Sequence, residues 1–274
     1  MKTGPIIRER IQGIPSWLWR RAAASPRLLM LDYDGTLAPF QDYPRQATPD
    51  PRARRLLYRM AASPGTTVAI ISGRPVREIA ALIGPLPVWL VGEHGWESRS
   101  PQGDIAFQAV PEPMKVTLGQ VARQAVQLGW GPWLERKNPS IVLHTRGLPA
   151  DEAREMTAAF ERLWLACAWG SGLRLRRVNG GLELKAPGYD KGTAVRDMMQ
   201  LAAPGTFPVY IGDDEGDEDA FRAVRDAGLG IRVGAEDRPS LARGRLKSPA
   251  AVAQFLDDWL AIFESREPCA GAAS

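Results

Sequence analysis

The feature that most constrains the fold of this chain is an apolar run that stops at two acids. Residues 28–37 read LLMLDYDGTL, so four large apolar side chains are followed by Asp32 and Asp34, and then by Gly35 and Thr36. A run without polar alternation is typical of a strand that is buried on both faces of a parallel sheet. The two acids then lie at the carboxyl end of that strand, which is the edge of an open α/β sheet where ligands bind.

Asp32 and Asp34 have a spacing that brings two carboxylates together. Side chains at positions i and i+2 of an extended segment point the same way, and like charges that close repel each other unless something compensates. Mg²⁺ is a common compensating ion, because it prefers oxygen ligands and takes one or two carboxylates together with substrate phosphate. The alternative is a strand end followed by an Asx-type turn, which many proteins contain without any function.

Composition narrows the class of protein. The chain has 274 residues, 45% of them hydrophobic and 24% charged, which is ordinary for a soluble globular protein with room for two modest domains. The net charge of +4 comes from scattered basic residues without an arm for nucleic acid, and it favours anionic substrates. Cys167 and Cys269 lack metal-binding spacing, and we find no signal peptide or membrane-length apolar run. We therefore expect a cytoplasmic protein that binds neither nucleic acid nor membrane.

A strand, a polar loop and a helix recur along both ends of the chain. This repeat predicts a doubly wound, Rossmann-like parallel sheet of the α/β class. A further helix is expected over 16–24, and a disordered tail over 264–274. The expected strands are 28–31, 66–71, 87–91, 207–211 and 229–233, and the expected helices are 51–62, 76–83, 192–201, 218–224 and 248–263.

The middle of the chain has a different order, α-β-β-α-β-β. It predicts a small α+β domain with an antiparallel sheet over 111–187, inserted into a discontinuous core formed by 1–110 and 188–274. The hairpin signal NGG at 179–181 supports this. The expected helices are 114–128 and 150–168, and the expected strands are 133–137, 140–145, 173–178 and 182–185.

Three later segments carry polar side chains where a strand ends or a helix begins. They are Ser72 in ISGR, Lys191 in YDKGTAV, and the run GDDEGDEDAF over 212–221. Taken singly, Ser72 is explained as a helix cap, Lys191 as a solvated cation and the acidic run as a solvated loop. Lys191, however, opposes the dipole of the helix that it begins, which suggests an anion nearby.

With DYDGT, these segments resemble, in order, the four motifs of the haloacid-dehalogenase (HAD) superfamily of phosphotransferases. The resemblance implies that Asp32 is the nucleophile that forms an aspartyl-phosphate, and that Asp34 is the general acid and base. It implies that Ser72 and Lys191 bind and neutralise the phosphoryl group. The neighbouring residues that match substrate-binding positions are Gly35, Thr36, Gly73 and Arg74.

The same resemblance implies a Mg²⁺ site. Asp32, the backbone carbonyl of Asp34 and Asp213 would hold the ion. Asp217 would bind the ion through water or support its ligands from behind, and Asp214 would orient Lys191 or the water ligands.

The inserted segment is similar to that of trehalose-6-phosphate phosphatases and would be the cap domain of the HAD core. The resemblance is carried by ERKNPSIVLHTR over 135–146, LELKAP over 182–187 and EHG over 93–95. It departs from the family pattern at Gly216, where a Thr is usual, and at Thr145, where a Tyr is common. The residues that it assigns to substrate binding are Glu93, His94, Glu135, Lys137, His144, Arg146 and Glu183. On spacing alone, cross-strand surface ion pairs are the preferred explanation of Glu135, Lys137 and Arg146, and the family resemblance reverses this preference.

The resemblance implies Mg²⁺-dependent hydrolysis of trehalose 6-phosphate to trehalose and phosphate, through an aspartyl-phosphate. The small-molecule substrate would come from a separate trehalose-6-phosphate synthase. Three alternatives stay open: another capped HAD phosphatase acting on sucrose phosphate, a mannosyl-phosphoglycerate or a hexose phosphate; a signalling receiver domain, against which chain length and the insertion argue; and a non-catalytic sugar-phosphate-binding regulator.

Overall fold

The structure is a computed structural model that describes residues 21, 24, 26–41, 46–178 and 180–264. The helix expected over 16–24 and the tail expected over 264–274 lie outside these residues, apart from positions 21, 24 and 264. The chain forms two compact units, one from the segments up to Ala106 and from Tyr189 onwards, the other from Phe107 to Gly188. None of the helices in the described part of the chain combines the length and apolarity that a membrane span requires.

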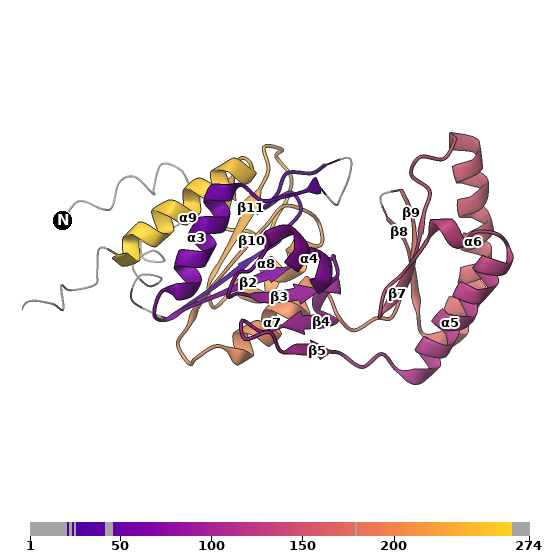
Figure 1. The fold of residues 1–274 in the computed structure, drawn as a ribbon, viewed down its shortest axis with the longest axis horizontal. Helices are drawn as coiled ribbons and strands as arrows, with labels where there is room; N and C mark the ends of the chain where they lie inside the picture. Colours follow the sequence, from indigo (N-terminus) through magenta and orange to yellow (C-terminus); the bar gives the residue numbers. More distant parts are fainter. Residues whose placement is uncertain (1–20, 22–23, 25, 42–45, 179, 265–274) are drawn as a thin grey trace, which may run out of the picture. The chain divides into compact units, whose positions relative to one another are not determined.

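The first unit is built on a mostly parallel sheet (Figure 1). Its eight described strands follow the order β12-β11-β10-β1-β2-β3-β4-β5, and those from β12 to β3 are parallel. The doubly wound α/β fold expected from the sequence is confirmed. The strands are β1 (Arg27–Leu31), β2 (Thr66–Ile71), β3 (Trp89–Gly92), β4 (Glu97–Arg99), β5 (Ile105–Phe107), β10 (Phe207–Gly212), β11 (Leu229–Val233) and β12 (Gly244–Leu246).

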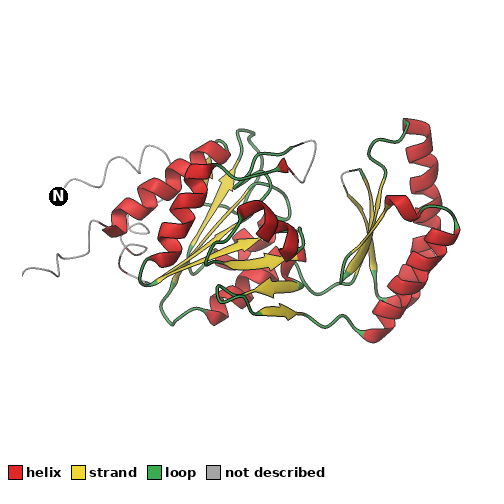
Figure 2. Ribbon diagram, viewed as in Figure 1, coloured by secondary structure: helices red, strands yellow, loops and turns green. Residues whose placement is uncertain are grey.

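The central strand β1 is buried on both faces, which explains its unbroken apolar sequence. Leu29 and Leu31 belong to a core with α3 (Pro51–Ala62), α4 (Val76–Ile83) and α9 (Pro249–Glu264). Leu28 and Met30 belong to a second core with α7 (Lys191–Leu201) and α8 (Asp217–Val224). Helices therefore cover both faces of the sheet (Figure 2).

Three short strands of this unit were not expected from the sequence. β4 pairs antiparallel with β3, β5 follows β4 in the sheet, and β12 extends the other edge. Each has only three residues, and β4 and β5 are not buried, so no apolar period marks them. They pair because the neighbouring strand presents unpaired backbone groups, which is a tertiary effect.

The second unit has a four-stranded antiparallel sheet with two helices on one face (Figure 1). Its strand order is β6-β7-β9-β8. Phe160 and Trp164 of α6 are fully buried, with ring centroids 4.8 Å apart. The elements are α5 (Glu112–Gln127), η3 (Gly131–Trp133), β6 (Leu134–Arg136), β7 (Ser140–His144), α6 (Ala150–Ser171), β8 (Arg174–Val178) and β9 (Gly181–Lys185).

Candidate active site

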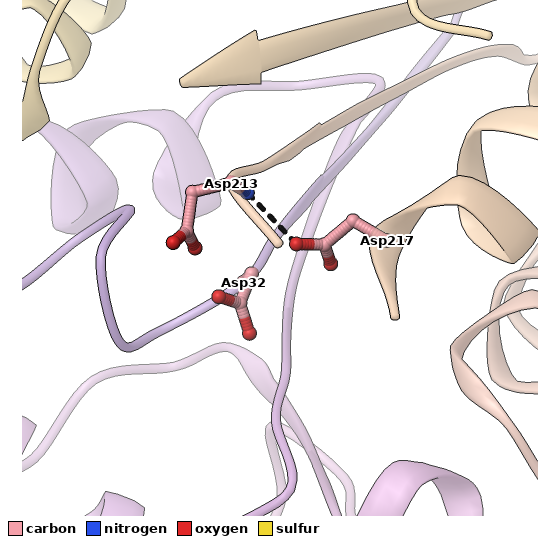
Figure 3. Close-up of side chains that lie close together, drawn as sticks. All are labelled: Asp32, Asp213 and Asp217. Atoms are coloured by element: carbon pink, nitrogen blue, oxygen red, sulfur yellow. Dashed lines mark hydrogen bonds between the residues drawn. The ribbon is translucent and has the colours of Figure 1, made fainter. Parts of the chain in front are cut away.

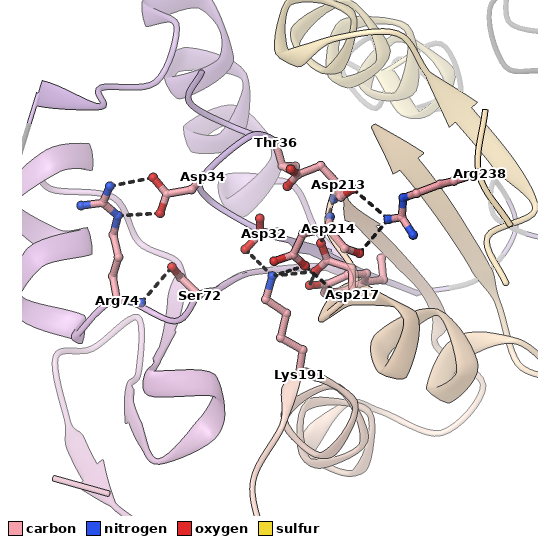
Figure 4. A network of polar contacts seen from close by, with 11 residues as sticks. Asp32, Asp34, Thr36, Ser72, Arg74, Lys191, Asp213, Asp214, Asp217 and Arg238 are labelled. Carbon is pink, nitrogen blue, oxygen red and sulfur yellow. Dashed lines mark hydrogen bonds and ion pairs between the residues drawn. The ribbon is translucent and has the colours of Figure 1, made fainter. Parts of the chain in front are cut away.

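The polar segments singled out in the sequence meet at one edge of the core sheet. Asp32 follows β1, Ser72 follows β2 and Asp213 follows β10, and these three strands are parallel neighbours. Their carboxyl ends therefore lie side by side, and Lys191 at the start of α7 points among them (Figure 4). Asp32, Ser72 and Lys191 are all at most 4% exposed.

Lys191 is the cation of this site. Its Nζ lies 2.9 Å from Asp32 Oδ1, 2.8 Å from Asp217 Oδ1 and 3.5 Å from Asp214 Oδ1. Burial alone would lower the pKa of Lys191, but the charges of Asp32, Asp217 and Asp214 outweigh it and raise the pKa well above its usual value. The ammonium therefore stays charged, and it can stabilise an anion that develops next to Asp32.

Three carboxylates lie close enough to hold a cation (Figure 3). One carboxylate oxygen from each of Asp32, Asp213 and Asp217 lies within 4.8 Å of the other two. Burial and then the charge of Asp217 raise the pKa of Asp213 to about 6. Burial likewise raises the pKa of Asp32 well above its usual range, although Lys191 opposes the shift. Hard oxygen donors that repel one another in this way fit Mg²⁺.

The carboxylate of Asp217 is already fully engaged within the protein. It accepts hydrogen bonds from Lys191, from the Tyr210 hydroxyl at 2.5 Å, and from the backbone N–H groups of Asp213 at 2.8 Å and Asp214 at 2.9 Å. Burial would raise its pKa, but Lys191, Asp214 and Tyr210 lower it below the usual value. Asp217 thus fastens the acidic loop, while Asp32 and Asp213 retain oxygens that a metal ion could use.

Asp34 faces a different partner from Asp32. Its carboxylate accepts two hydrogen bonds from Arg74, from Nε and from Nη2, each at 2.6 Å. The alternation that would place Asp34 beside Asp32 ends with β1 at Leu31, and Gly35 then turns the chain at φ +78°. The structure therefore brings Arg74 to Asp34 and leaves the Asp34 carboxylate outside the metal-type cluster of described residues (Figure 4).

Two glycines of the site matter because they have no side chain. A Cβ on Gly35 would lie 2.2 Å from Asp213 Oδ2, and a Cβ on Gly73 would lie 2.8 Å from the ring of His94. Any larger residue would displace these groups. Thr36 donates from its hydroxyl to Asp213 Oδ1 at 3.2 Å, so Gly35 and Thr36 together position Asp213.

The EHG segment lies against the ISGR loop. The backbone N–H groups of Glu93 and His94 donate to the carbonyls of Arg74 and Ser72, at 3.0 and 2.9 Å. Both residues adopt positive φ, 49° and 60°, which is uncommon outside glycine and typical of functional sites. The Ser72 hydroxyl accepts the N–H of Arg74 at 3.1 Å and so closes the turn that precedes α4. The helix cap expected for Ser72 taken singly is wrong, because the N-cap of α4 is Pro75 and no side chain caps that helix.

Arg238 supports the acidic loop from outside the four motifs. Its Nη2 donates to the carbonyls of Asp213 and Asp214, both at 2.9 Å, and its Nη1 lies 3.1 Å from Glu218. Sequence reasoning missed Arg238 and also Tyr210. Tyr210 lies within the apolar strand FPVYI, and Arg238 is separated from the motif by more than a helix and a strand, so no local pattern marks either residue.

In the second unit, the face of the sheet that carries no helices is polar. Register places Glu135, Val142, Glu183 and Arg176 in one row across its four strands. Glu183 is 5% exposed, and its carboxylate accepts from Ser140 Oγ at 2.8 Å and from Arg176 Nε at 2.6 Å. Burial would raise the pKa of Glu183, but the nearby cations, Arg176 first, and the Ser140 hydrogen bond lower it. Sequence reasoning did not identify Arg176.

The other charged residues of this face are gathered around Glu135. Its Oε2 lies 2.8 Å from His144 Nε2 and 3.8 Å from Lys137 Nζ. Arg146 follows β7 and lies close to Gly180. The arrangement contains the cross-strand ion pairs that spacing alone suggested, and it also presents donors and acceptors in fixed positions, as recognition of sugar hydroxyls requires.

Comparison with known proteins identifies the family. The family model described as trehalose-phosphatase matches residues 30–250, which is most of the chain. The chain belongs to the trehalose-phosphatase family. It is 36% identical over 230 residues to the bifunctional trehalose-6-phosphate synthase/phosphatase of Thermoproteus tenax, covering 82% of this chain and 30% of that one. It is 34% identical over 244 residues to the trehalose-phosphate phosphatase of Mycobacterium marinum, covering 83% of this chain and 60% of that protein. The chain thus spans less than two thirds of the length of these curated relatives.

Solved structures of the same family share the fold. The C-terminal domain of trehalose-6-phosphate phosphatase from Candida albicans superposes with a TM-score of 0.71 at 21% identity, covering 89% of this chain and 96% of that one. The trehalose-6-phosphate phosphatase of Aspergillus fumigatus gives a TM-score of 0.63 at 27% identity, covering 90% and 96%. The HAD-type core with an inserted cap, expected from the sequence, is confirmed at the level of fold.

Proposed function

We propose that this protein hydrolyses trehalose 6-phosphate to trehalose and phosphate, with Mg²⁺ as cofactor. One observation carries the proposal: a chain of the trehalose-phosphatase family holds a buried carboxylate, Asp32, 2.9 Å from a buried ammonium, Lys191. A nucleophile next to a fixed positive charge, at the ligand-binding edge of the sheet, is the arrangement that phosphoryl transfer to a carboxylate needs.

The proposed reaction has two steps. In the first, an Asp32 oxygen attacks phosphorus, the bond from phosphorus to the sugar oxygen breaks, and that oxygen takes a proton from Asp34. In the second, water attacks the aspartyl-phosphate and gives its proton to Asp34, and the bond from phosphorus to Asp32 breaks to release phosphate. Lys191 and Ser72 would bind the phosphoryl oxygens and neutralise the charge that builds up on them.

The metal would be held by Asp32, the Asp34 carbonyl and Asp213. The raised pKa values of Asp32 and Asp213 support this, because both carboxylates are destabilised by burial and by negative neighbours in a way that a cation relieves. When bound, Mg²⁺ would offset the negative charge on the phosphoryl group. Asp217, fully occupied by four donors, would fix the loop that carries Asp213. Asp214 would orient Lys191.

The sugar would be recognised by residues of the unit that spans Phe107–Gly188, which we propose is the cap. Glu135, Lys137, Arg146 and Glu183 would contact hydroxyls, and His144 would orient Glu135. The loops of the core recognise only phosphate and metal, so discrimination between sugar phosphates has to come from such side chains. We further propose that a trehalose-6-phosphate synthase supplies the substrate.

Phosphate release from a panel of sugar phosphates, with and without Mg²⁺, tests the proposal. We expect trehalose 6-phosphate to be preferred over sucrose 6-phosphate, a mannosyl-phosphoglycerate and glucose 6-phosphate. Asp32→Asn should abolish turnover in a folded protein, because an amide cannot attack phosphorus and is a poor Mg²⁺ ligand. Asp226→Asn, at an exposed position away from the site, is the matched control. Preference for another sugar phosphate, or turnover by Asp32→Asn, would overturn the proposal.

A further inference from the structure

A second group of cations lies at the far edge of the core sheet. Arg232 of β11 and Arg245 of β12 are register partners in adjacent parallel strands, so their side chains leave the same face of the sheet side by side. Arg243 is two residues before Arg245 and directly precedes β12. Like charges paired in this way are unfavourable in a sheet unless an anion compensates.

These arginines surround a cavity of about 220 Å³. Arg232 is only 5% exposed, although it carries a permanent charge on a buried strand. The residues that line the cavity are Arg232, Asp237, Arg238, Ser240, Ala242, Arg243, Gly244 and Arg245.

The carboxylates around the cavity neutralise only part of this charge. Glu218 pairs with Arg238 at 3.1 Å. Asp237 is the one carboxylate that lines the cavity, its side chain is fully exposed, and it lies 3.4 Å from Arg245. An ion pair of that kind contributes little. Burial, and then the charges of Arg245 and Arg238, lower the pKa of Arg232, as expected where several guanidinium groups face one another.

The contacts that these side chains do make orient them without cancelling their charge. Arg245 donates to the carbonyls of Gly234, Ala235 and Glu236, and Arg232 donates to the carbonyl of Glu236. The loop therefore fixes two guanidinium groups against the cavity. Arg243 is exposed, and no side-chain hydrogen bond or ion pair within the described residues engages it.

We propose that this cavity is an oxyanion site that binds a group of the phosphate class, either free phosphate or the phosphoryl group of a metabolite. Guanidinium groups bind tetrahedral oxyanions through paired N–H donors, and several of them held in place around one cavity match a doubly charged anion. The cavity shares no lining residue with the cluster of Asp32, Asp213 and Asp217, and the proposal does not depend on the proposed reaction.

Arg238 connects this site to the acidic loop. It lines the cavity, and it also donates to the carbonyls of Asp213 and Asp214 (Figure 4). An anion that binds beside Arg238 holds this side chain more firmly against the loop. Amide hydrogen exchange over 213–217 is therefore expected to slow when the site is filled.

Calorimetric titration of the full chain with inorganic phosphate, without added metal, tests the site. Phosphate can also bind near Lys191, so the phosphate affinities of Arg243→Gln and Arg225→Gln are compared to assign the binding event to the cavity. Arg243→Gln should weaken one binding event roughly tenfold, because a hydrogen bond to a charged group is lost, and it should leave the fold intact. Arg225→Gln removes the same charge from an exposed position outside the cavity and should change nothing.

Two further experiments locate the bound anion and identify its source. Selenate soaked into crystals should give anomalous density between Arg232, Arg243 and Arg245. Glucose 6-phosphate, titrated in place of phosphate, distinguishes the two sources: dependence on Arg243 for both ligands indicates a phosphoryl group, and dependence for phosphate alone indicates the free ion. Phosphate binding that is unchanged by Arg243→Gln, or selenate density only near Lys191, would overturn the proposal.

Discussion

Arg74 forms a bidentate ion pair with Asp34, with both N–O distances at 2.6 Å and the Arg74 side chain only 11% exposed. The Arg74 guanidinium also lies over the ring of Tyr33, 5.6 Å from its centroid, and the bond to Asp34 raises the pKa of Arg74. The proposed acid–base group is thus held by a partner that was expected to bind substrate. Both roles are compatible if the phosphoryl group takes over Arg74 and leaves Asp34 free to exchange a proton.

This relationship predicts that Arg74 and Asp34 act as a unit. Arg74→Gln should lower kcat/KM for trehalose 6-phosphate on the order of tenfold to a hundredfold, as expected for the loss of a charged hydrogen-bond partner. If Arg74 works through Asp34, Arg74→Gln should add almost nothing in an Asp34→Asn background. Steady-state kinetics of the two single variants and the double variant measures this. Fully additive effects would mean that Arg74 contacts substrate independently of Asp34.

Metal removal should make the stability of the protein depend on pH in a specific direction. In the metal-free state the pKa of Asp213 is about 6, above its ordinary value of 3.8. Between these values the folded protein holds a proton that the unfolded chain has lost, so stability falls as pH rises through this window. Asp32 and Asp214 have raised pKa values and act in the same direction, whereas Asp217, with a lowered pKa, stays ionised throughout.

Mg²⁺ should reverse this loss, because it stabilises the ionised carboxylates. We expect the difference in Tm between Mg²⁺ and chelator to be small at about pH 5 and to grow up to about pH 7.5. Thermal denaturation across that range measures it. In Asp213→Asn, most of the increase of this Tm difference with pH should disappear. A Tm difference that does not change with pH in the unsubstituted protein would contradict a metal bound by Asp213.

Arg176 is predicted to position Glu183 for sugar recognition. Arg176→Gln should lower kcat/KM for trehalose 6-phosphate roughly tenfold and leave p-nitrophenyl phosphate, which has no sugar, nearly unchanged. The neighbouring Arg177→Gln is a matched control, because Arg177 lies opposite Leu182 in register and pairs with Glu161 of α6 at 2.7 Å. Equal losses with both substrates would show that Arg176 supports the fold alone.

The sequence predicts those elements and site residues that are marked by their immediate neighbours in the chain. The strand β1 and its acids stand out because a doubly buried strand needs an unbroken apolar run and a motif follows it directly. Tyr210, Arg238 and Arg176 do not stand out, because their roles arise from partners that are distant in sequence. Asp34 turns away from Asp32 and toward Arg74 because β1 ends at Leu31 and Gly35 adopts a positive φ. The spacing of the two acids in the sequence predicts neither feature.

The acidic loop also departs from the usual family pattern at Gly216, and the structure predicts that this glycine is dispensable. Gly216 has φ −65° and ψ −20°, a helical conformation open to any residue. A Cβ there would lie 3.2 Å from Asp214 Oδ1, which also accepts from the N–H of Asp217 at 3.1 Å. The Asp214 side chain is 56% exposed, so it can shift by the few tenths of an ångström that a Cβ requires and keep this bond. The four hydrogen bonds to Asp217 hold the loop without help from position 216.

Gly216→Ala should therefore raise the free energy of unfolding by about 0.5 kcal/mol, since it restricts the unfolded chain, and should keep kcat/KM within about twofold. Gly205→Ala is the matched control: its φ of +78° strains any side chain although no atom lies within 4 Å, so this variant should lose stability. Urea denaturation measures the change in the free energy of unfolding for each variant, which should be an increase for Gly216→Ala and a decrease for Gly205→Ala. A less stable Gly216→Ala protein would show that the acidic loop needs glycine at this position, because Asp214 cannot make room for a Cβ.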